Sequence, residues 1–338
     1  MRNFREGRMT LNLKIVAKGI FIAFCIFIAV LLLVEVADRT LFRAKSIFGR
    51  TVKDFERQRG EIQILFLGQS DIKRAVIPEA MSFKAYNFAE LGESFIETYF
   101  KLKYYIDEMP SLKVVVLALP LTSFSSFRTN RINTRYYSYG YISFRDLWEL
   151  YQIKGPFVIG QKLVSLSPIL DPGQLRAFWK NVRRLIKKQP IERAVIQEGY
   201  HLLTIKGIVN ERMAIRSIQR HFQGHNIYDK DLLLYFEKIL TLCYERGIKV
   251  VTLTTPMTDY YIMHAEKYIT KADLYEKVFT NPKFSSYIYK HLDYLDLYAK
   301  DRALFVDEDH LSHKGAILFS KQIASELSKV MEQIKKGP

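Results

Sequence analysis

The chain has 338 residues, of which 49% are hydrophobic and 14% aromatic. This is enough to bury a core in one large domain, or in one domain that carries an insertion, and it argues against a disordered protein. The 51 lysines and arginines exceed the 35 acidic residues by 16, which favours anionic partners such as lipid headgroups, acidic glycopolymers or nucleic acid. With only two cysteines, Cys25 and Cys243, neither a disulfide framework nor a thiolate metal cluster is expected.

The N-terminal region contains a long apolar segment. Residues 15–34 read IVAKGIFIAFCIFIAVLLLV with Lys18 as the one charge, and a helix of this length spans about 30 Å, the thickness of the hydrocarbon core. We expect a transmembrane anchor over residues 15–36. A cleaved signal peptide is the competing interpretation, but the segment is long and Glu35 stands where a small residue should precede the cut.

Charges around this segment predict its orientation. Residues 1–14 are expected in the cytoplasm and the C-terminal domain outside, as a single-pass membrane protein, because cations dominate before the span and mix with acids after it. The cations that precede or enter the span are Arg2, Arg5, Arg8, Lys14 and Lys18, and the charges that follow it are Glu35, Asp38, Arg39, Arg43, Lys45 and Arg50.

After a polar connector over residues 37–60, strands and helices alternate. Continuous apolar runs predict buried parallel strands, and capping signals predict the helices between them. The expected strands are 61–67, 85–89, 112–119 and 248–254, and the expected helices are 95–108, 231–246 and 314–335. This order predicts an α/β fold with a parallel sheet flanked by helices in three layers. The active site is then expected at the carboxyl ends of the strands.

Residues 121–228 do not follow this alternation of strands and helices, and they are expected to form a helical insertion. Its stretch 135–151 is dense in aromatic residues, which suits sugar or acyl contacts but suits ordinary packing better. Its stretch 174–188 predicts an amphipathic helix with a basic face. That helix suits either an anionic membrane surface or packing on the core. Nucleic acid is not expected, because no recognised reading motif is present.

Two short motifs carry residue types used in acyl transfer. Ser70 follows the first strand by three residues, and Asp307 precedes His310 by three residues shortly before the last helix. A serine needs a base beside it, and an acid can hold the imidazole in the required tautomer. Each residue has a structural alternative: a turn or helix cap for Ser70, and a surface position for His310. Asp309 and His313 are rivals for the acid and the base.

These motifs resemble those of the SGNH, or GDSL-type, hydrolase superfamily. The matching blocks are Gly68-Gln69-Ser70, Tyr86-Asn87-Phe88-Ala89-Glu90-Leu91-Gly92, and Asp307-x-x-His310-Leu311-Ser312-x-x-Gly315. An α/β-hydrolase elbow is excluded, since it needs glycine where Ile72 stands. The resemblance covers residues 61–119 and 248–330 and implies an SGNH-like domain over 61–338. It implies Ser70, His310 and Asp307 as catalytic residues, with the backbone N–H groups of Ser70 and Gly92 in the oxyanion hole.

The chain departs from the family pattern in two places. Gln69 replaces the usual aspartate, and Leu119-Pro120-Leu121-Thr122-Ser123 stands where the family has Gly-x-Asn-Asp. Loss of that asparagine would remove a side-chain donor from the oxyanion hole, which typically costs a hundredfold or more in rate. Asn87 is the expected replacement donor.

With its anchor and insertion, the chain resembles the membrane-tethered SGNH proteins that work with membrane-bound O-acyltransferases. These modify envelope polymers by D-alanylation of lipoteichoic acid or O-acetylation of exopolysaccharide. The resemblance implies a serine acyltransferase or esterase on acyl or acetyl esters of an anionic or polysaccharide polymer, without a cofactor or metal. An O-acyltransferase and the cytoplasmic membrane are its implied partners. The alternative is a catalytically impaired relative that binds glycan or scaffolds an O-acyltransferase complex.

Overall fold

A computed structural model describes residues 2–129, 132–189, 196–202 and 209–336. The parts of the predicted insertion at 130–131, 190–195 and 203–208, and the last two residues of the predicted domain, lie outside the described residues. The helices are α1 (Arg2–Ala37), α2 (Ile47–Gln58), α3 (Ser70–Ala75), α4 (Phe95–Tyr105), α5 (Thr134–Ser138), α6 (Phe144–Lys154), α7 (Phe157–Val164), α8 (Pro172–Ile186), α9 (Glu211–Phe222), α10 (Lys230–Tyr244), α11 (Asp259–Ala265), α12 (Lys271–Phe279), α13 (Pro282–Ser285) and α14 (His313–Lys336).

The strands form a parallel sheet and a separate hairpin. They are β1 (Ile64–Leu67), β2 (Ala85–Asn87), β3 (Val114–Ala118), β4 (Ile196–Gln197), β5 (Tyr200–His201), β6 (Lys249–Thr254) and β7 (Ile288–Asp293). The main sheet has the order β2-β1-β3-β6-β7, and all its neighbouring strands are parallel. The predicted α/β class with a parallel sheet flanked by helices is therefore confirmed, and β7 is a strand that the sequence analysis missed.

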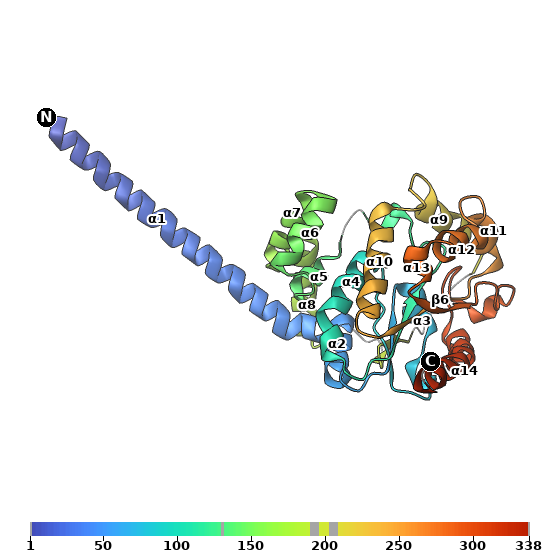
Figure 1. Ribbon diagram of the computed structural model, residues 1–338. Coiled ribbons are helices and arrows are strands. Elements are labelled where there is room, and N and C mark those ends of the chain that lie inside the picture. The colour runs from blue at the N-terminus through green and yellow to red at the C-terminus, as the bar shows by residue number, and fades with distance from the viewer. Residues whose placement is uncertain (1, 130–131, 190–195, 203–208, 337–338) are drawn as a thin grey trace.

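Helices cover both faces of this sheet (Figure 1). Alternate residues of the central strands point to opposite faces, so Leu65 and Val115 join one apolar cluster while Phe66 and Val116 join another. The first cluster contains buried side chains of α2, α4 and α10, and the second contains those of α3 and α14. Three layers result, with the sheet in the middle.

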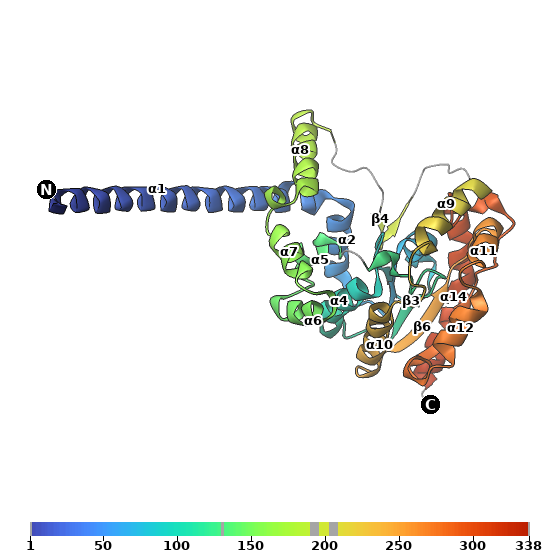
Figure 2. The ribbon, with the colours of Figure 1, turned by 90° about the horizontal axis from the view of Figure 1, so that it is seen from above.

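The N-terminal helix α1 projects from the body of the protein (Figures 1 and 2). It is long and apolar enough to cross a membrane, and most of its large apolar side chains are exposed, including Leu33 at 70%. The predicted polar connector over residues 37–60 is largely helical. A π-helical turn over Asp38–Phe42 continues α1, and α2 then packs on the sheet.

The helix α2 was missed because its sequence is largely polar. It buries Phe48, Val52 and Phe55 along one face, and Phe55 stacks on Phe88 at a ring-centroid distance of 4.1 Å. Short helical turns and α2 therefore connect α1 to the core.

The predicted insertion is helical in its described part, with the short β4–β5 hairpin added. Helices α5 to α8 lie beside the end of α1 that joins the body, while α9 lies on the far side of the molecule (Figure 2). The amphipathic segment forms α8, which buries only Phe178. The alternative of a helix packed broadly on the core therefore does not fit α8.

Candidate active site

Ser70 is positioned by the tight exit from β1. Gly68 adopts φ +140°, and a Cβ on it would lie 2.3 Å from the Cβ of Ala118 in β3, so only glycine fits there. The chain then turns through Gln69 into α3, whose first residue is Ser70. As an N-terminal helix residue, Ser70 has a backbone N–H without a partner inside the helix.

Ser70 lies at the topological switch point of the sheet, where consecutive connections lead to opposite sides. Since β1 and β3 are neighbours and β2 lies on the other side of β1, the connections after β1 and β3 lead away in opposite directions. In such sheets a ligand crevice forms at this point, outside the carboxyl ends of the strands. Across it, the Gln69 amide donates to the Thr122 hydroxyl at 3.1 Å. Ser70 therefore stands where α/β proteins commonly bind ligands.

His310 comes from a tight loop that faces Ser70. The Val306 N–H donates to the His310 carbonyl at 3.0 Å, and a bridge joins Phe305 to Leu311. The Thr258 hydroxyl, just after β6, donates to the Glu308 carbonyl at 2.8 Å. These bonds hold the loop against the carboxyl edge of the sheet.

Ser70, His310 and Asp307 lie in one hydrogen-bonded chain. Nε2 of His310 is 2.8 Å from Oγ of Ser70, and Nδ1 of His310 is 2.7 Å from Oδ1 of Asp307. The His310 side chain is only 13% exposed. The structure thus brings together the three residues that the sequence analysis singled out, in the order serine, histidine and carboxylate.

A second carboxylate shares the same nitrogen of His310. Oδ1 of Asp309 is 3.0 Å from Nδ1. Burial disfavours the imidazolium, but the Asp309 charge and the hydrogen bonds to Asp307 and Asp309 outweigh it and raise the pKa of His310 to about 10. The neutral imidazole is then the minor form at pH 7. Asp309, ranked below Asp307 from sequence, is thus a second partner of the base.

The other sequence candidates have different surroundings. Nδ1 of His313 is 3.0 Å from the Tyr200 hydroxyl, so His313 is tied to β5. The Asn87 amide donates both its hydrogens, to the Ile72 carbonyl at 2.9 Å and the Val76 carbonyl at 2.8 Å. In this structure the Asn87 amide therefore secures the end of α3 with both of its hydrogens.

Gly92 lies in the turn after β2. It has φ +72°, and the nearby Glu90 N–H donates to the Gly68 carbonyl at 3.0 Å. The turn is therefore fastened to the exit of β1 that leads to Ser70.

Asp71, beside the nucleophile, is a buried carboxylate with few partners. The Thr255 hydroxyl donates to its Oδ2 at 3.3 Å, while its Oδ1 has no hydrogen-bond partner among the described residues. Burial raises the pKa of Asp71, opposed by the Ile72 N–H and by the positive charges of His310 and Arg128. Asp71 is therefore a buried acid next to Ser70 in the chain, within the electrostatic reach of His310 and Arg128.

Arg128 is the site residue that sequence reasoning missed. Burial lowers the pKa of Arg128, and the charges of Asp71 and Asp309 oppose that shift. Its side chain also lines a small cavity of about 20 Å³ together with Gly68 and Gln69. It lies on the loop after β3, ten residues beyond the end of that strand. No motif in the sequence marked it.

The acid cluster could also hold a cation. Asp307, Asp309 and His310 each offer a ligand atom within 4.8 Å of the others. A metal on Nδ1 of His310 would keep the proton on Nε2, and that nitrogen could no longer accept a proton from Ser70. Metal binding and base catalysis therefore exclude one another at this histidine.

Comparisons of the sequence with protein-family models and with curated proteins gave no match.

Proposed function

We propose that the chain is a membrane-anchored serine esterase or O-acyltransferase that acts on acyl or acetyl esters of a cell-envelope polymer. The observation that carries the proposal is the contact of Ser70 Oγ with His310 Nε2 at 2.8 Å, with Asp307 at 2.7 Å behind the imidazole. This is the spacing that nucleophilic catalysis by serine requires. In the proposal, the domain lies outside the cytoplasmic membrane.

The proposed reaction has two steps. Nε2 of neutral His310 accepts the Ser70 proton while Oγ attacks the ester carbonyl, and the imidazolium then protonates the departing alkoxide, leaving an acyl-serine. A polymer hydroxyl next gives its proton to His310 and attacks the acyl-serine, which releases the ester product and restores Ser70. Water as the acceptor makes the same residues an esterase.

The negative charge on the carbonyl oxygen needs donors in both steps. The proposed donors are the backbone N–H groups of Ser70 and Gly92. Arg128 is proposed to support them by its positive charge, because it lines a cavity beside Gly68 and Gln69. A guanidinium in this place would substitute for the side-chain amide that the resemblance led us to expect.

The anchor narrows the proposed acceptors. An apolar helix long enough to cross a membrane, joined to the core by short helical turns, keeps the catalytic domain close to the lipid surface. Polymers that begin at the membrane are then within reach, which favours transfer over free hydrolysis. We propose a membrane-bound O-acyltransferase as the source of the acyl group.

A second candidate function is a catalytically impaired protein that binds glycan or scaffolds a transferase complex. Two observations favour it. Both hydrogens of the Asn87 amide are bound to backbone carbonyls, so they are not offered to an oxyanion. His310 has a pKa of about 10, so its protonated form, which cannot act as a base, predominates at neutral pH. Envelope modification that persists in a strain carrying Ser70→Ala would support this function.

Labelling of the full-length protein by a fluorophosphonate tests the proposed nucleophile. The reaction is run at pH 9, where more of His310 is neutral, with wild type, Ser70→Ala and the surface control Ser82→Ala. We expect the label on the Ser70 peptide in wild type and in Ser82→Ala only. Equal labelling of Ser70→Ala, or no labelling of wild type, would refute the assignment.

A further inference from the structure

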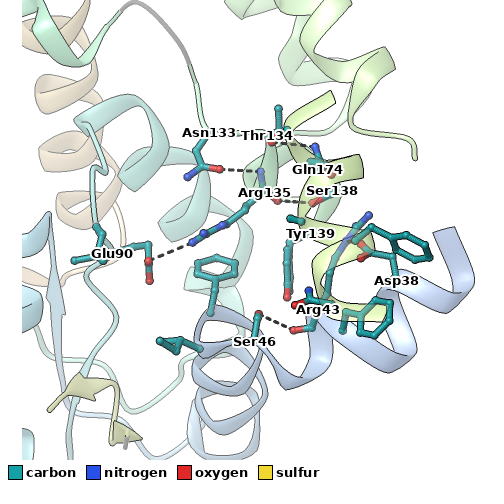
Figure 3. A pocket seen from close by; sticks show the side chains of 18 of the residues that line it. Asp38, Arg43, Ser46, Glu90, Asn133, Thr134, Arg135, Ser138, Tyr139 and Gln174 are labelled. Atoms are coloured by element: carbon teal, nitrogen blue, oxygen red, sulfur yellow. Dashed lines mark hydrogen bonds and ion pairs between the residues drawn. The ribbon is translucent and has the colours of Figure 1, made fainter. Parts of the chain in front are cut away.

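A second cavity, of about 500 Å³, lies between the end of α1 and the helical insertion. Asp38, Phe42 and Arg43, which directly follow α1, form one wall, and residues of α5 and α8 form the facing walls (Figure 3). It is distinct from the Ser70 site, since none of the three triad residues lines it. Its position between a membrane-spanning helix and a catalytic domain suggests a ligand from the membrane.

Contacts with α1 place this cavity at the level of the membrane surface. The Ser167 hydroxyl donates to the Leu31 carbonyl at 3.4 Å, and Leu31 lies inside the apolar stretch of α1. Phe178 of α8 packs edge-on against Phe42 at 5.3 Å between ring centroids. The apolar stretch ends at Val34, which precedes Asp38 by four residues, or about 6 Å along a helix. The cavity wall at Asp38 is therefore about one headgroup layer from the apolar stretch.

Exposed apolar side chains near the same end of α1 also indicate that the cavity lies at the level of the membrane surface. Leu166, one residue before Ser167, is 50% exposed, and Trp179 of α8 is 55% exposed. Tryptophan is enriched at the boundary between lipid and water. If α1 crosses a bilayer, these side chains face lipid instead of water, and the mouth of the cavity faces headgroups.

The inner end of the cavity, around Glu90, has more cations than carboxylates. Lys73, whose side chain is 1% exposed, lies 3.3 Å from Glu90, and Arg135 lies 3.4 Å from the same carboxylate, as Figure 3 shows for Arg135. Arg43, in contrast, pairs with both Glu35 and Asp38. One carboxylate thus serves two cations at the inner end of the cavity. An anionic group such as phosphate would complete this charge balance.

The inner end of the cavity also adjoins the nucleophile. Lys73 lies on α3, one turn after Ser70. Glu90, the shared partner of Lys73 and Arg135, donates its backbone N–H to the Gly68 carbonyl at 3.0 Å. A ligand bound at Arg135 would therefore sit beside the elements that hold the serine in place.

We propose that this cavity binds the phosphate headgroup of a membrane phospholipid. The phosphate pairs with Arg135 and Lys73, and the glycerol backbone and upper acyl chain lie along Phe42 and Phe178 toward the bilayer. The proposal rests on the membrane anchoring in the proposed function and adds a lipid site next to α3. It makes a phosphate-bearing amphiphile the class of molecule that this domain receives from the membrane.

Photocrosslinking of the full-length protein in lipid nanodiscs tests this. The probe is phosphatidylglycerol with a diazirine in its upper acyl chain, applied to wild type, Arg135→Gln and Arg135→Lys. Arg176→Gln, which removes an exposed arginine of α8 that does not line the cavity, is the matched control. We expect crosslinks around Phe42 and Phe178 that fall at least tenfold in Arg135→Gln, recover in Arg135→Lys, and persist in Arg176→Gln.

Three competitors distinguish a phospholipid from a lipid without phosphate and from a soluble phosphate ester. Unlabelled phosphatidylglycerol should abolish the crosslinks, whereas diacylglycerol, which lacks phosphate, and soluble glycerol 3-phosphate should not. Competition by diacylglycerol would refute phosphate recognition, and competition by soluble glycerol 3-phosphate at equal concentration would refute a lipid ligand. Absence of wild-type crosslinks with Ser70 labelling intact would overturn the lipid site alone. Crosslinks without Ser70 labelling would overturn only the proposed catalysis.

Discussion

Replacing Asp309 with asparagine removes the negative charge 3.0 Å from Nδ1 of His310 and keeps an oxygen in nearly the same place. Burial and the two neighbouring acids together set the pKa of His310 at about 10. Because the proposed reaction begins with neutral His310, the rate of Ser70 acylation should rise with pH up to that value. Without the Asp309 charge, the same rise should occur at lower pH.

The size of this shift follows from the geometry. Two unit charges about 4 Å apart interact by about 4 kcal/mol at an effective dielectric constant of about 20, which corresponds to about three pKa units. The side chains of His310 and Asp309 are 13% and 15% exposed, and Arg128 offsets part of the Asp309 charge. We therefore expect Asp309→Asn to lower the pKa of His310 by about one to three units.

The assay measures the rate constant for fluorophosphonate labelling of Ser70 between pH 6 and 10.5. Wild type, Asp309→Asn and the exposed control Asp301→Asn are compared, and the ring nitrogens of His310 are followed by NMR over the same range. At pH 7, Asp309→Asn should react faster than wild type, by about tenfold or more. A wild-type midpoint near the ordinary histidine value, or the same midpoint in all three proteins, would refute this reasoning.

Three further predictions concern stability and rate. The pKa of His310 rises from 6.5 to about 10 on folding, so its charged form stabilises the protein fully below pH 6.5 and this contribution is lost as pH rises through about 10. The difference in Tm between wild type and His310→Gln should therefore shrink over that interval, and a constant difference would contradict it. Gly68→Ala places a Cβ 2.3 Å from the Cβ of Ala118 at φ +140°. Denaturant unfolding should therefore show a free energy of unfolding lower by about 2 to 4 kcal/mol, and Ser70 labelling should be weaker. Unchanged stability would show that the chain after β1 is not constrained at Gly68. Arg128→Gln should slow Ser70 labelling about tenfold or more if its charge supports the oxyanion, while Arg216→Gln, an exposed arginine on α9, should not; equal rates in the two variants would remove Arg128 from the mechanism.

The sequence predicted much of the sheet and the key contact of the site. Apolar runs marked β1, β2, β3 and β6 because strands covered on both faces need few polar residues. Ser70 and His310 could be paired because a parallel sheet gathers its functional side chains at one edge. Strand β7 at the sheet edge was missed, since its sequence Ile288–Asp293 mixes lysine, histidine and aspartate with apolar residues.

Other features depended on distances that spacing does not encode. Asn87 was expected in the oxyanion hole from its block, but its amide caps carbonyls of α3. Asp309 looked secondary because it is adjacent to His310, yet the loop folds its carboxylate onto Nδ1. Arg128 reaches the site from a 3-10 turn over Ser126–Arg128 in the connection after β3, and no periodicity in the sequence predicts where this connection returns to the sheet. Helix α2 did have a helical spacing of apolar residues, at Phe48, Val52 and Phe55, but the polar residues between them made it easy to miss.

The central claim is that Ser70 carries an acyl group, and the most direct measurement is mass spectrometry of the Ser70 peptide. Full-length protein is incubated at pH 9 with an acetylated polymer fragment, quenched with acid within seconds, and digested. We predict a peptide heavier by one acetyl group, with the modification on Ser70, that is absent in Ser70→Ala and disappears when excess acceptor is added. An unmodified Ser70 peptide together with continued ester turnover would contradict the account.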